Sequence, residues 1–160
     1  MTPGLRLLID TNVWMDYFLD RSASHDLARS VILEATRREV CLLSAIHSAK
    51  DCFFLIQLEL KRMERSENGC VSDQAASAIR EVAWSCMRAM RQLSTVVAAD
   101  MADMVEAAVM RDLHPDFEDN LIGAAALRAG ADHVVTSDRA LLAHQPVSCI
   151  TLEQALRLIA

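Results

Sequence analysis

Two aspartates, Asp10 and Asp138, stand where short apolar runs end. Residues 5–9 form an apolar run that leads directly into Asp10, and residues 133–136 precede Asp138 with one residue between. If both runs are parallel strands, their carboxyl ends meet at one edge of the sheet, where ligands bind in this class of fold. Carboxylates held close together repel each other unless one is protonated or a cation lies between them. The pair therefore predicts a metal-ion site.

Three further aspartates belong to segments that would reach the same edge. Asp116 and Asp119 open an alanine-rich segment, and their spacing places both on one face of a helix. Asp51 lies in the first turns of the helix expected after residues 40–43. Oxygen ligands suit Mg²⁺ or Mn²⁺, which can activate water and stabilise charge during hydrolysis of a nucleic-acid phosphodiester. We expect the catalytic residues to be Asp10, Asp51, Asp119 and Asp138, and the metal ligands to be Asp10, Asp116, Asp119 and Asp138.

Each of these acids also has a structural explanation. Asp116 is a candidate helix N-cap, with Asp119 reciprocating from the first turn. Asp138 is a candidate cap for a short helix. Asp51 has no geometric support beyond its position in a helix. The structural explanation is weakest for Asp10, because an acid without a partner at the end of a buried strand is costly.

Short apolar runs alternate with helical patterns along the chain. Strands are expected at residues 5–9, 40–43, 95–98, 133–136 and 147–150. Helices are expected at residues 11–19, 24–38, 45–65, 73–93, 100–111, 117–129 and 151–159, with a loop at 64–72. Strands that alternate with helices form a parallel sheet covered on both faces. The expected fold is α/β, a three-layer α/β/α sandwich with a central parallel sheet of about five strands, in one domain spanning residues 1–160.

The distribution of charge limits how the chain could act on a nucleic acid. The net charge is −6, and residues 1–95 carry 12 basic and 12 acidic side chains. Residues 96–160 carry 4 basic and 10 acidic side chains, so the excess lies there. This pattern gives no basic footprint of the kind that nucleic-acid-binding proteins usually carry. Chemistry on a nucleic acid would therefore need cations to bring phosphate to the acids.

Other signals in the sequence point to a cytoplasmic protein without membrane contact. No apolar run approaches the roughly 18 residues that a membrane span needs. The first ten residues do not resemble a secretory signal. The five cysteines are odd in number and widely spaced, which argues against a zinc site or a disulfide framework.

Three motifs together resemble those of PIN domains. They are Leu8-Ile-Asp-Thr-Asn12, Asp116-Phe-Glu-Asp119 followed by the alanine-rich segment, and Ala131-Asp-His-Val-Val-Thr-Ser-Asp138. They match in order and spacing, and the resemblance covers essentially the whole chain. It implies a Mg²⁺- or Mn²⁺-dependent ribonuclease specific for single-stranded RNA. Such enzymes are often VapC-type toxins of type II toxin–antitoxin systems, silenced by a cognate antitoxin protein.

The resemblance carries over residue by residue. Asp10, Asp119 and Asp138 match the first, third and fourth acids of the family, and Asp116 matches an extra acid of the DFED subgroup. Asn12 matches the polar residue after the first acid, and it is expected to support the site together with Thr136.

The family's second acid, usually a glutamate, is the point of departure. Asp51 takes that place here, whereas a shift of one residue would put Lys50 there and leave the site one ligand short. Phe54, Leu55 and Leu58 follow Asp51 at helical spacing, so we expect that side of the helix to face the sheet, with Asp51 at the end of the stripe.

Two other segments have alternative interpretations. Arg80, Trp84, Arg88 and Arg91 fall within about 80° of arc on a helix, which could guide single-stranded RNA by charge and stacking. The alternative, which we favour, is a solvated face with Trp84 covering a neighbour. The apolar residues 53–60 are interpreted as core, the alternative being a contact with a second subunit in a homodimer or with an antitoxin. No role is assigned to His47, His114, His133 or His144.

Competing functions fit less well. Phosphotransfer enzymes with an aspartate nucleophile carry a second acid two residues after the first, where this chain has Asn12. A nucleotide-binding fold would need a glycine-rich turn after the first strand, and the glycines do not cluster there. The remaining rival is a PIN-like scaffold that binds RNA or protein without cutting.

Overall fold

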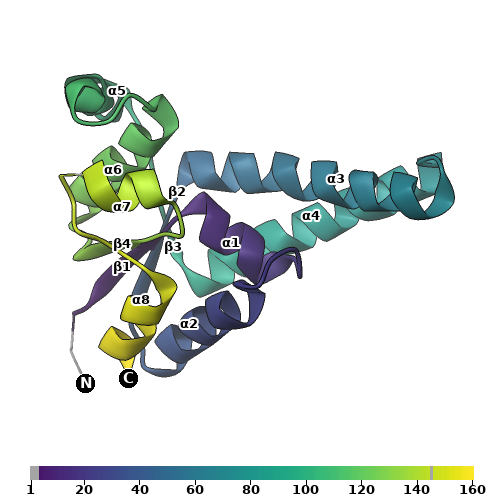
Figure 1. The fold of residues 1–160 in the computed structure, drawn as a ribbon, viewed down its shortest axis with the longest axis horizontal. Coiled ribbons are helices and arrows are strands. Elements are labelled where there is room, and N and C mark those ends of the chain that lie inside the picture. The colour runs from purple at the N-terminus through teal and green to yellow at the C-terminus, as the bar shows by residue number, and fades with distance from the viewer. Residues whose placement is uncertain (1–3, 145) are drawn as a thin grey trace.

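The computed structural model describes residues 4–144 and 146–160. Helices and strands alternate as the sequence predicts (Figure 1). The strands are β1 (Arg6–Ile9), β2 (Cys41–Ala45), β3 (Thr95–Val97), β4 (His133–Val135) and β5 (Cys149–Ile150). The helices are α1 (Thr11–Phe18), α2 (His25–Arg37), α3 (Ile46–Asn68), α4 (Asp73–Leu93), α5 (Met101–Val109), α6 (Phe117–Ala129), α7 (Arg139–His144) and α8 (Leu152–Ile159). A 3-10 turn, η1 (Met110–Asp112), ends the segment expected as one helix over residues 100–111.

The strands form one five-stranded parallel sheet in the order β3-β2-β1-β4-β5. The central strand β1 pairs with β2 on one side and β4 on the other, so that Leu8 lies opposite Leu43 and Val134. All five strands were expected, although β5 begins two residues later than predicted. The prediction of a parallel α/β sheet is confirmed.

Successive residues of β1 point to opposite faces of the sheet, and each face has its own apolar core. Leu7 and Ile9 pack with residues of α1, α2, α3, α4 and α8. Leu8 packs with residues of α6 and α7 on the other face, including Ile122 and Leu141. Because helices cover both faces, the predicted three-layer α/β/α sandwich is confirmed (Figure 1).

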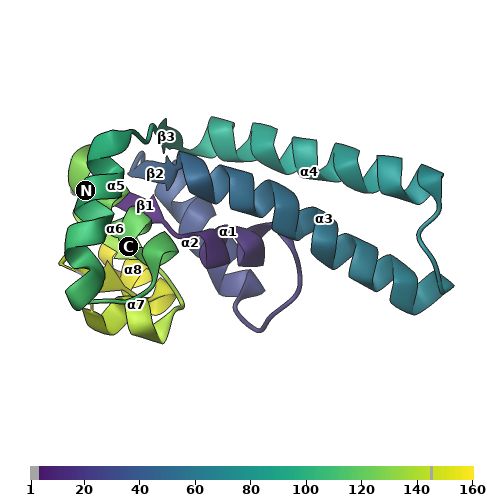
Figure 2. The ribbon, with the colours of Figure 1, turned by 90° about the horizontal axis from the view of Figure 1, so that it is seen from above.

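Helices α3 and α4 form a long antiparallel hairpin that extends away from the sheet (Figures 1 and 2). The loop predicted at residues 64–72 is shorter than expected, because α3 continues to Asn68. Gly69 ends the helix with a φ of 77°, a left-handed conformation that glycine adopts without steric cost. Within the described residues, no helix has both the length and the apolar character that crossing a membrane requires.

The apolar residues of α3 do not all belong to the core, and this corrects the sequence interpretation of residues 53–60. Phe54 and Leu58 are 64% and 51% exposed, and Leu55 also lies at the surface. The buried line of α3 runs instead through Ser48, Cys52 and Ile56. Where the hairpin extends beyond the sheet, the side of α3 that carries Phe54, Leu55 and Leu58 has no sheet to face, and these side chains remain in contact with solvent.

Candidate active site

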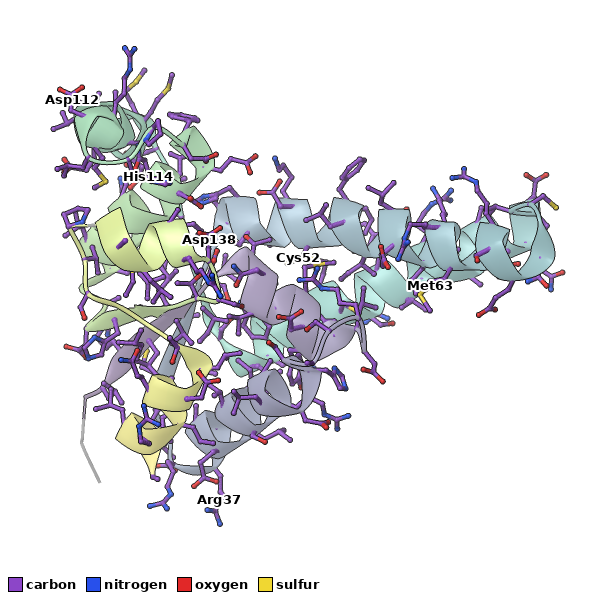
Figure 3. All side chains as sticks on the ribbon, in the orientation of Figure 1. Arg37, Cys52, Met63, Asp112, His114 and Asp138 are labelled. Atoms are coloured by element: carbon purple, nitrogen blue, oxygen red, sulfur yellow. The ribbon has the colours of Figure 1, made fainter. Side chains whose placement is uncertain are left out.

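A pocket of about 610 Å³ opens where β1 and β4 end. The chain proceeds from β1 to β2 and β3 on one side and to β4 and β5 on the other, so this is the point where the strand order reverses. Open α/β sheets bind ligands at such a point. The acids that line the pocket are Asp10, Asp51, Glu59, Glu118, Asp119 and Asp138. Figure 3 places Asp138 near the first turns of α1 and α3, from which other lining residues come.

Asp10 is almost fully buried, and protein donors occupy both of its carboxylate oxygens. The backbone N–H of Thr11 donates to Oδ1 at 2.6 Å, because Asp10 is the N-cap of α1. The hydroxyl of Thr136 donates to Oδ2 at 2.7 Å from the neighbouring strand end. These bonds hold the carboxylate in one orientation at the base of the pocket.

Thr136 connects the polar residues of the two strand ends. Its Oγ1 accepts hydrogen bonds from the Asn12 amide at 3.2 Å and from the Asp138 backbone N–H at 3.0 Å. The amide oxygen of Asn12 in turn accepts from the backbone N–H of Ser137. Asn12 and Thr136 are thus hydrogen-bonded to the strand ends that carry Asp10 and Asp138, and their supporting role in the site stays a prediction.

The electrostatics of Asp10 reflect a crowded acidic site. Burial raises the pKa of Asp10 from its ordinary value of 3.8 to about 6, and the charges of Asp119 and Asp138 contribute to the rise. The hydrogen bonds from Thr136 and Thr11 oppose that rise by favouring the ionised carboxylate. A carboxyl group that burial makes difficult to ionise is stabilised in its ionised form by a cation beside it.

Asp119 faces the pocket from the first turn of α6, held by a histidine to which the sequence analysis assigned no role. The Nε2 of His114 lies 2.7 Å from Oδ2 of Asp119, and His114 is itself buried. An ionised carboxylate can only accept, so the ring N–H donates. Burial and the charges of Asp116 and Asp138 raise the pKa of Asp119, whereas the His114 bond lowers it.

The capping roles considered for Asp138 and Asp116 have different outcomes in the structure. Asp138 lines the pocket and also caps α7, accepting from the N–H groups of Ala140 and Leu141. Asp116 caps α6, where its Oδ1 accepts from the N–H groups of Glu118 and Asp119. Asp116 is not among the residues that line the pocket, so its position fits the cap better than the expected metal ligand.

Asp51 lines the pocket from the second turn of α3, whereas Lys50 does not. The two are nevertheless in contact, because Nζ of Lys50 lies 2.6 Å from Oδ1 of Asp51. The Lys50 side chain is largely exposed and reaches back to the carboxylate from outside. The prediction that the side of α3 with Phe54, Leu55 and Leu58 faces the sheet is wrong. These three residues line the pocket and are exposed.

The pocket also contains residues that the sequence analysis missed. Arg21, from the segment between α1 and α2, lines it, and so does His47 one turn before Asp51. Burial lowers the pKa of His47, and neither ring nitrogen has a hydrogen-bond partner among the described residues. The spacing of four between His47 and Asp51 could have placed both on one helix face. No periodic signal marks Arg21.

The basic face of α4 lies outside this pocket. None of Arg80, Trp84, Arg88 and Arg91 is a lining residue. Trp84 is half exposed, and its ring centroid lies 4.9 Å from that of Phe53. This contact fits the alternative in which Trp84 covers a neighbour. A role of this face in RNA binding stays a prediction.

The described carboxylates of the pocket do not form a preformed metal-binding cluster. In the described parts of the chain, no three His, Cys, Asp or Glu side chains are arranged so that they could already hold a metal ion. The site is thus an acidic pocket whose carboxylates face a common volume without meeting at one point.

Comparison with known proteins gives a family and a fold. Residues 6–140 match the family model described as PIN domain. A structure of VapBC2 from Rickettsia felis, bound to a DNA fragment from its promoter, contains a similar chain, with a TM-score of 0.65 and 10% identity over 92% of this chain and 98% of that one. PAE2754 from Pyrobaculum aerophilum has a TM-score of 0.60 and 21% identity over 97% and 89%. VapC20 from Mycobacterium tuberculosis, a toxin that cleaves the sarcin–ricin loop, has a TM-score of 0.54 and 15% identity over 80% and 86%. None of the curated proteins searched matches the chain.

Proposed function

The chain belongs to the PIN-domain family, and from this premise we propose that it is a Mg²⁺- or Mn²⁺-dependent endoribonuclease that hydrolyses phosphodiesters of single-stranded RNA. We propose further that it is the toxin of a type II toxin–antitoxin system. One observation carries the enzymatic proposal: Asp10, Asp119 and Asp138, from three separate elements, line one pocket. Their mutual influence supports it, because the charges of Asp119 and Asp138 raise the pKa of Asp10.

The donor set suits the proposed metal. Asp10, Asp119 and Asp138 would hold it, and their carboxylate oxygens are ligands that Mg²⁺ and Mn²⁺ prefer. The described carboxylates do not form a preformed metal-binding cluster, but Mg²⁺ usually keeps several waters and is held by only one or two carboxylates. When bound, the ion would lower the pKa of a water molecule and offset the negative charge that develops on the phosphodiester.

Other residues of the chain would hold the acids and the attacking water in position. Thr136 and the N–H of Thr11 keep Asp10 in place, and His114 does the same for Asp119. We assign Asp51, which lines the same pocket from α3, to the positioning of the attacking water. This assignment rests on the position of Asp51 in the pocket and on its match to the family's second acid.

The proposed antitoxin would cover the same pocket. The exposed wall formed by Phe54, Leu55 and Leu58 adjoins the acids, so a protein with apolar side chains around a basic one would complement it. VapC20, which shares the fold, is a toxin. We expect the neighbouring gene to encode such an inhibitor, and co-expression followed by co-purification tests this. An expressed chain that does no harm in its own host and has no co-purifying neighbour product would contradict it.

A homodimer, the other partner expected from the sequence, remains a proposal. Light scattering on the purified chain, measured across a range of concentrations, decides between one and two copies.

The nuclease assay tests the enzymatic proposal directly. The purified chain is incubated with a labelled single-stranded oligoribonucleotide in Mg²⁺, in Mn²⁺ and in chelator, with a duplex of the same sequence for comparison. Cleavage of the single strand is expected only with metal, and Asp10→Asn and Asp119→Asn should abolish it. Asp26→Asn serves as the matched control, because Asp26 is an exposed acid of α2 away from the pocket.

The same assay separates the nuclease from a non-cleaving PIN-like scaffold. Binding of the oligoribonucleotide without cleavage in either metal would favour the scaffold. Full activity in chelator would contradict the metal-dependent mechanism.

A further inference from the structure

One arginine stands among the acids of the pocket. Arg21 lies in the segment between α1 and α2 and lines the pocket together with Asp10, Asp119 and Asp138. It is the one Lys or Arg among the described lining residues, and burial lowers the pKa of His47, which disfavours a second positive charge. The ammonium of Lys50 lies nearby, but Lys50 does not line the pocket and is paired with Asp51. Among the described residues, Arg21 is therefore the one lining cation that a polyanionic strand entering this pocket would meet.

The position of Arg21 is fixed by a buried carboxylate. Its Nη2 lies 3.1 Å from Oδ1 of Asp16 and 3.3 Å from the backbone oxygen of Asn12. Asp16 is only 4% exposed, and its Oδ1 also accepts from the hydroxyl of Ser22 at 2.9 Å. The ring Nδ1 of His25 contacts the Asp16 backbone oxygen at 2.7 Å, which ties the start of α2 to the same point. The guanidinium is thus held at the pocket edge by α1, the helix that Asp10 caps.

The contacts with α1 leave part of the guanidinium available. Both are made by Nη2, so Nε and Nη1 have no hydrogen-bond partner among the described residues. Arginine carries N–H donors on all three nitrogens, and its planar group suits phosphate oxygens. A pre-positioned guanidinium binds with a smaller loss of side-chain entropy than a free one.

We propose that Arg21 is a phosphate-binding residue that holds the backbone of single-stranded RNA at the edge of the acidic pocket. This inference rests on the proposed function. Arg21 offsets the repulsion between the strand and the acids, and it positions a phosphate of the strand beside them. Asp16 acts through Arg21 as a positioning residue. In a purely structural role, by contrast, the Arg21–Asp16 pair would only tie the α1–α2 segment down.

The salt dependence of RNA binding distinguishes these roles. Affinity of a labelled single-stranded oligoribonucleotide is measured by anisotropy over a series of salt concentrations, together with KM, kcat and melting temperature. Arg21→Gln should weaken binding and raise KM about tenfold, the usual order for a lost charged hydrogen bond, with a much smaller change in kcat. The slope of log affinity against log salt should fall by about 0.7, the value for one phosphate contact on a single strand.

Two further variants and a control complete the test. Arg21→Lys keeps the charge and should retain the wild-type salt slope, whereas Asp16→Asn should weaken binding without changing that slope. Arg29→Gln removes an exposed arginine of α2 that does not line the pocket, and it should change neither quantity. A wild-type KM and salt slope in Arg21→Gln would overturn the inference, even if the melting temperature falls.

Failure of the proposed function gives a different result. A wild-type chain that binds the oligoribonucleotide with an Arg21-dependent salt slope but never cleaves it would contradict the nuclease and leave Arg21 as a phosphate-binding residue. A chain that neither binds nor cleaves it would overturn both.

Discussion

The hydroxyl of Thr136, at the end of β4, donates a hydrogen bond of 2.7 Å to the buried Oδ2 of Asp10, at the end of β1. This bond joins the two strand ends on either side of the point where the strand order reverses. It favours the ionised form of a carboxylate whose pKa burial nevertheless raises to about 6. The site therefore keeps an acid that is oriented for a cation but costly to ionise without one.

We predict that Asp10→Asn stabilises the metal-free protein at pH 7.5 and reduces the pH dependence of its stability. Because the folded pKa of about 6 exceeds the ordinary value of 3.8, folding favours the protonated acid. The stabilising contribution of this group is fully present below pH 3.8 and is lost as the pH rises through 6. The cost of ionisation is on the order of 3 kcal/mol at pH 7.5, and part of the gain is offset by altered hydrogen bonds to the new amide.

Denaturant unfolding in chelator at pH 5 and 7.5 measures this effect, with Asp26→Asn as the control. A variant less stable than wild type at pH 7.5, with its pH dependence unchanged, would show that Asp10 is not the group responsible.

Replacement of Thr136 by valine should impair stability and catalysis together. Valine keeps the shape but cannot donate to Asp10 or accept from Asn12 and Asp138. Leaving buried polar groups without partners costs about 1–3 kcal/mol, and loss of a group that supports metal ligands costs roughly 10–100-fold in activity or metal affinity. Thr136→Ser retains the hydroxyl and should stay close to wild type in both unfolding and initial-rate assays. Equal losses in the two variants would assign the effect to packing.

Metal binding and capping by Asp116 can be separated in one thermal experiment. Mg²⁺ or Mn²⁺ should raise the melting temperature of the wild type, since a ligand at 100 times its Kd stabilises the folded state by about 2.7 kcal/mol. Asp138→Asn should weaken that rise. Asp116→Ala should lower stability by roughly 1 kcal/mol through loss of the α6 cap, yet keep the metal-dependent rise, because Asp116 is not a lining residue. A rise that disappears in Asp116→Ala would return this residue to the metal ligands expected from the sequence.

The sequence predicts the sheet and the placement of Asp10, Asp119 and Asp138 around one pocket, for a physical reason. An acid directly after an apolar run, such as Asp10, has few positions other than a strand end, and parallel strands bring such ends together. Helical periodicity is less informative, because it identifies an apolar side of α3 without saying what covers that side. The side with Phe54 and Leu58 has solvent beside it. Arg21 lies in a polar segment without periodicity, so only the tertiary structure places it in the pocket.

Two substitutions in α3 test that correction. Ile56→Ala removes a fully buried side chain and should cost about 2–5 kcal/mol. Leu58→Ala removes an exposed side chain, so its effect on the free energy of unfolding should stay within about 0.5 kcal/mol. Comparable losses in the two variants would mean that residues 53–60 form the core, as the sequence interpretation had it.

The last prediction concerns the second acid of the site. Asp51 lines the pocket and Lys50 does not, as expected for neighbours about 100° apart around a helix. The ammonium of Lys50 nevertheless contacts Oδ1 of Asp51, so the Asp51 carboxylate already has a cation beside it before substrate binds. Because that lysine is 73% exposed, solvent screens the contact, and the pair contributes little to stability.

Asp51→Ala should therefore reduce kcat at least about 100-fold, as expected for a group that positions a ligand or water, with little change in melting temperature. Lys50→Ala should change the rate by less than about threefold, the range of a screened surface pair, and Lys50→Glu tests whether the charge beside Asp51 matters. Initial rates with the single-stranded oligoribonucleotide in Mn²⁺ measure all three. If Lys50→Ala loses activity and Asp51→Ala keeps it, then Lys50 is the functional residue at this position, and the site has one acid fewer than proposed.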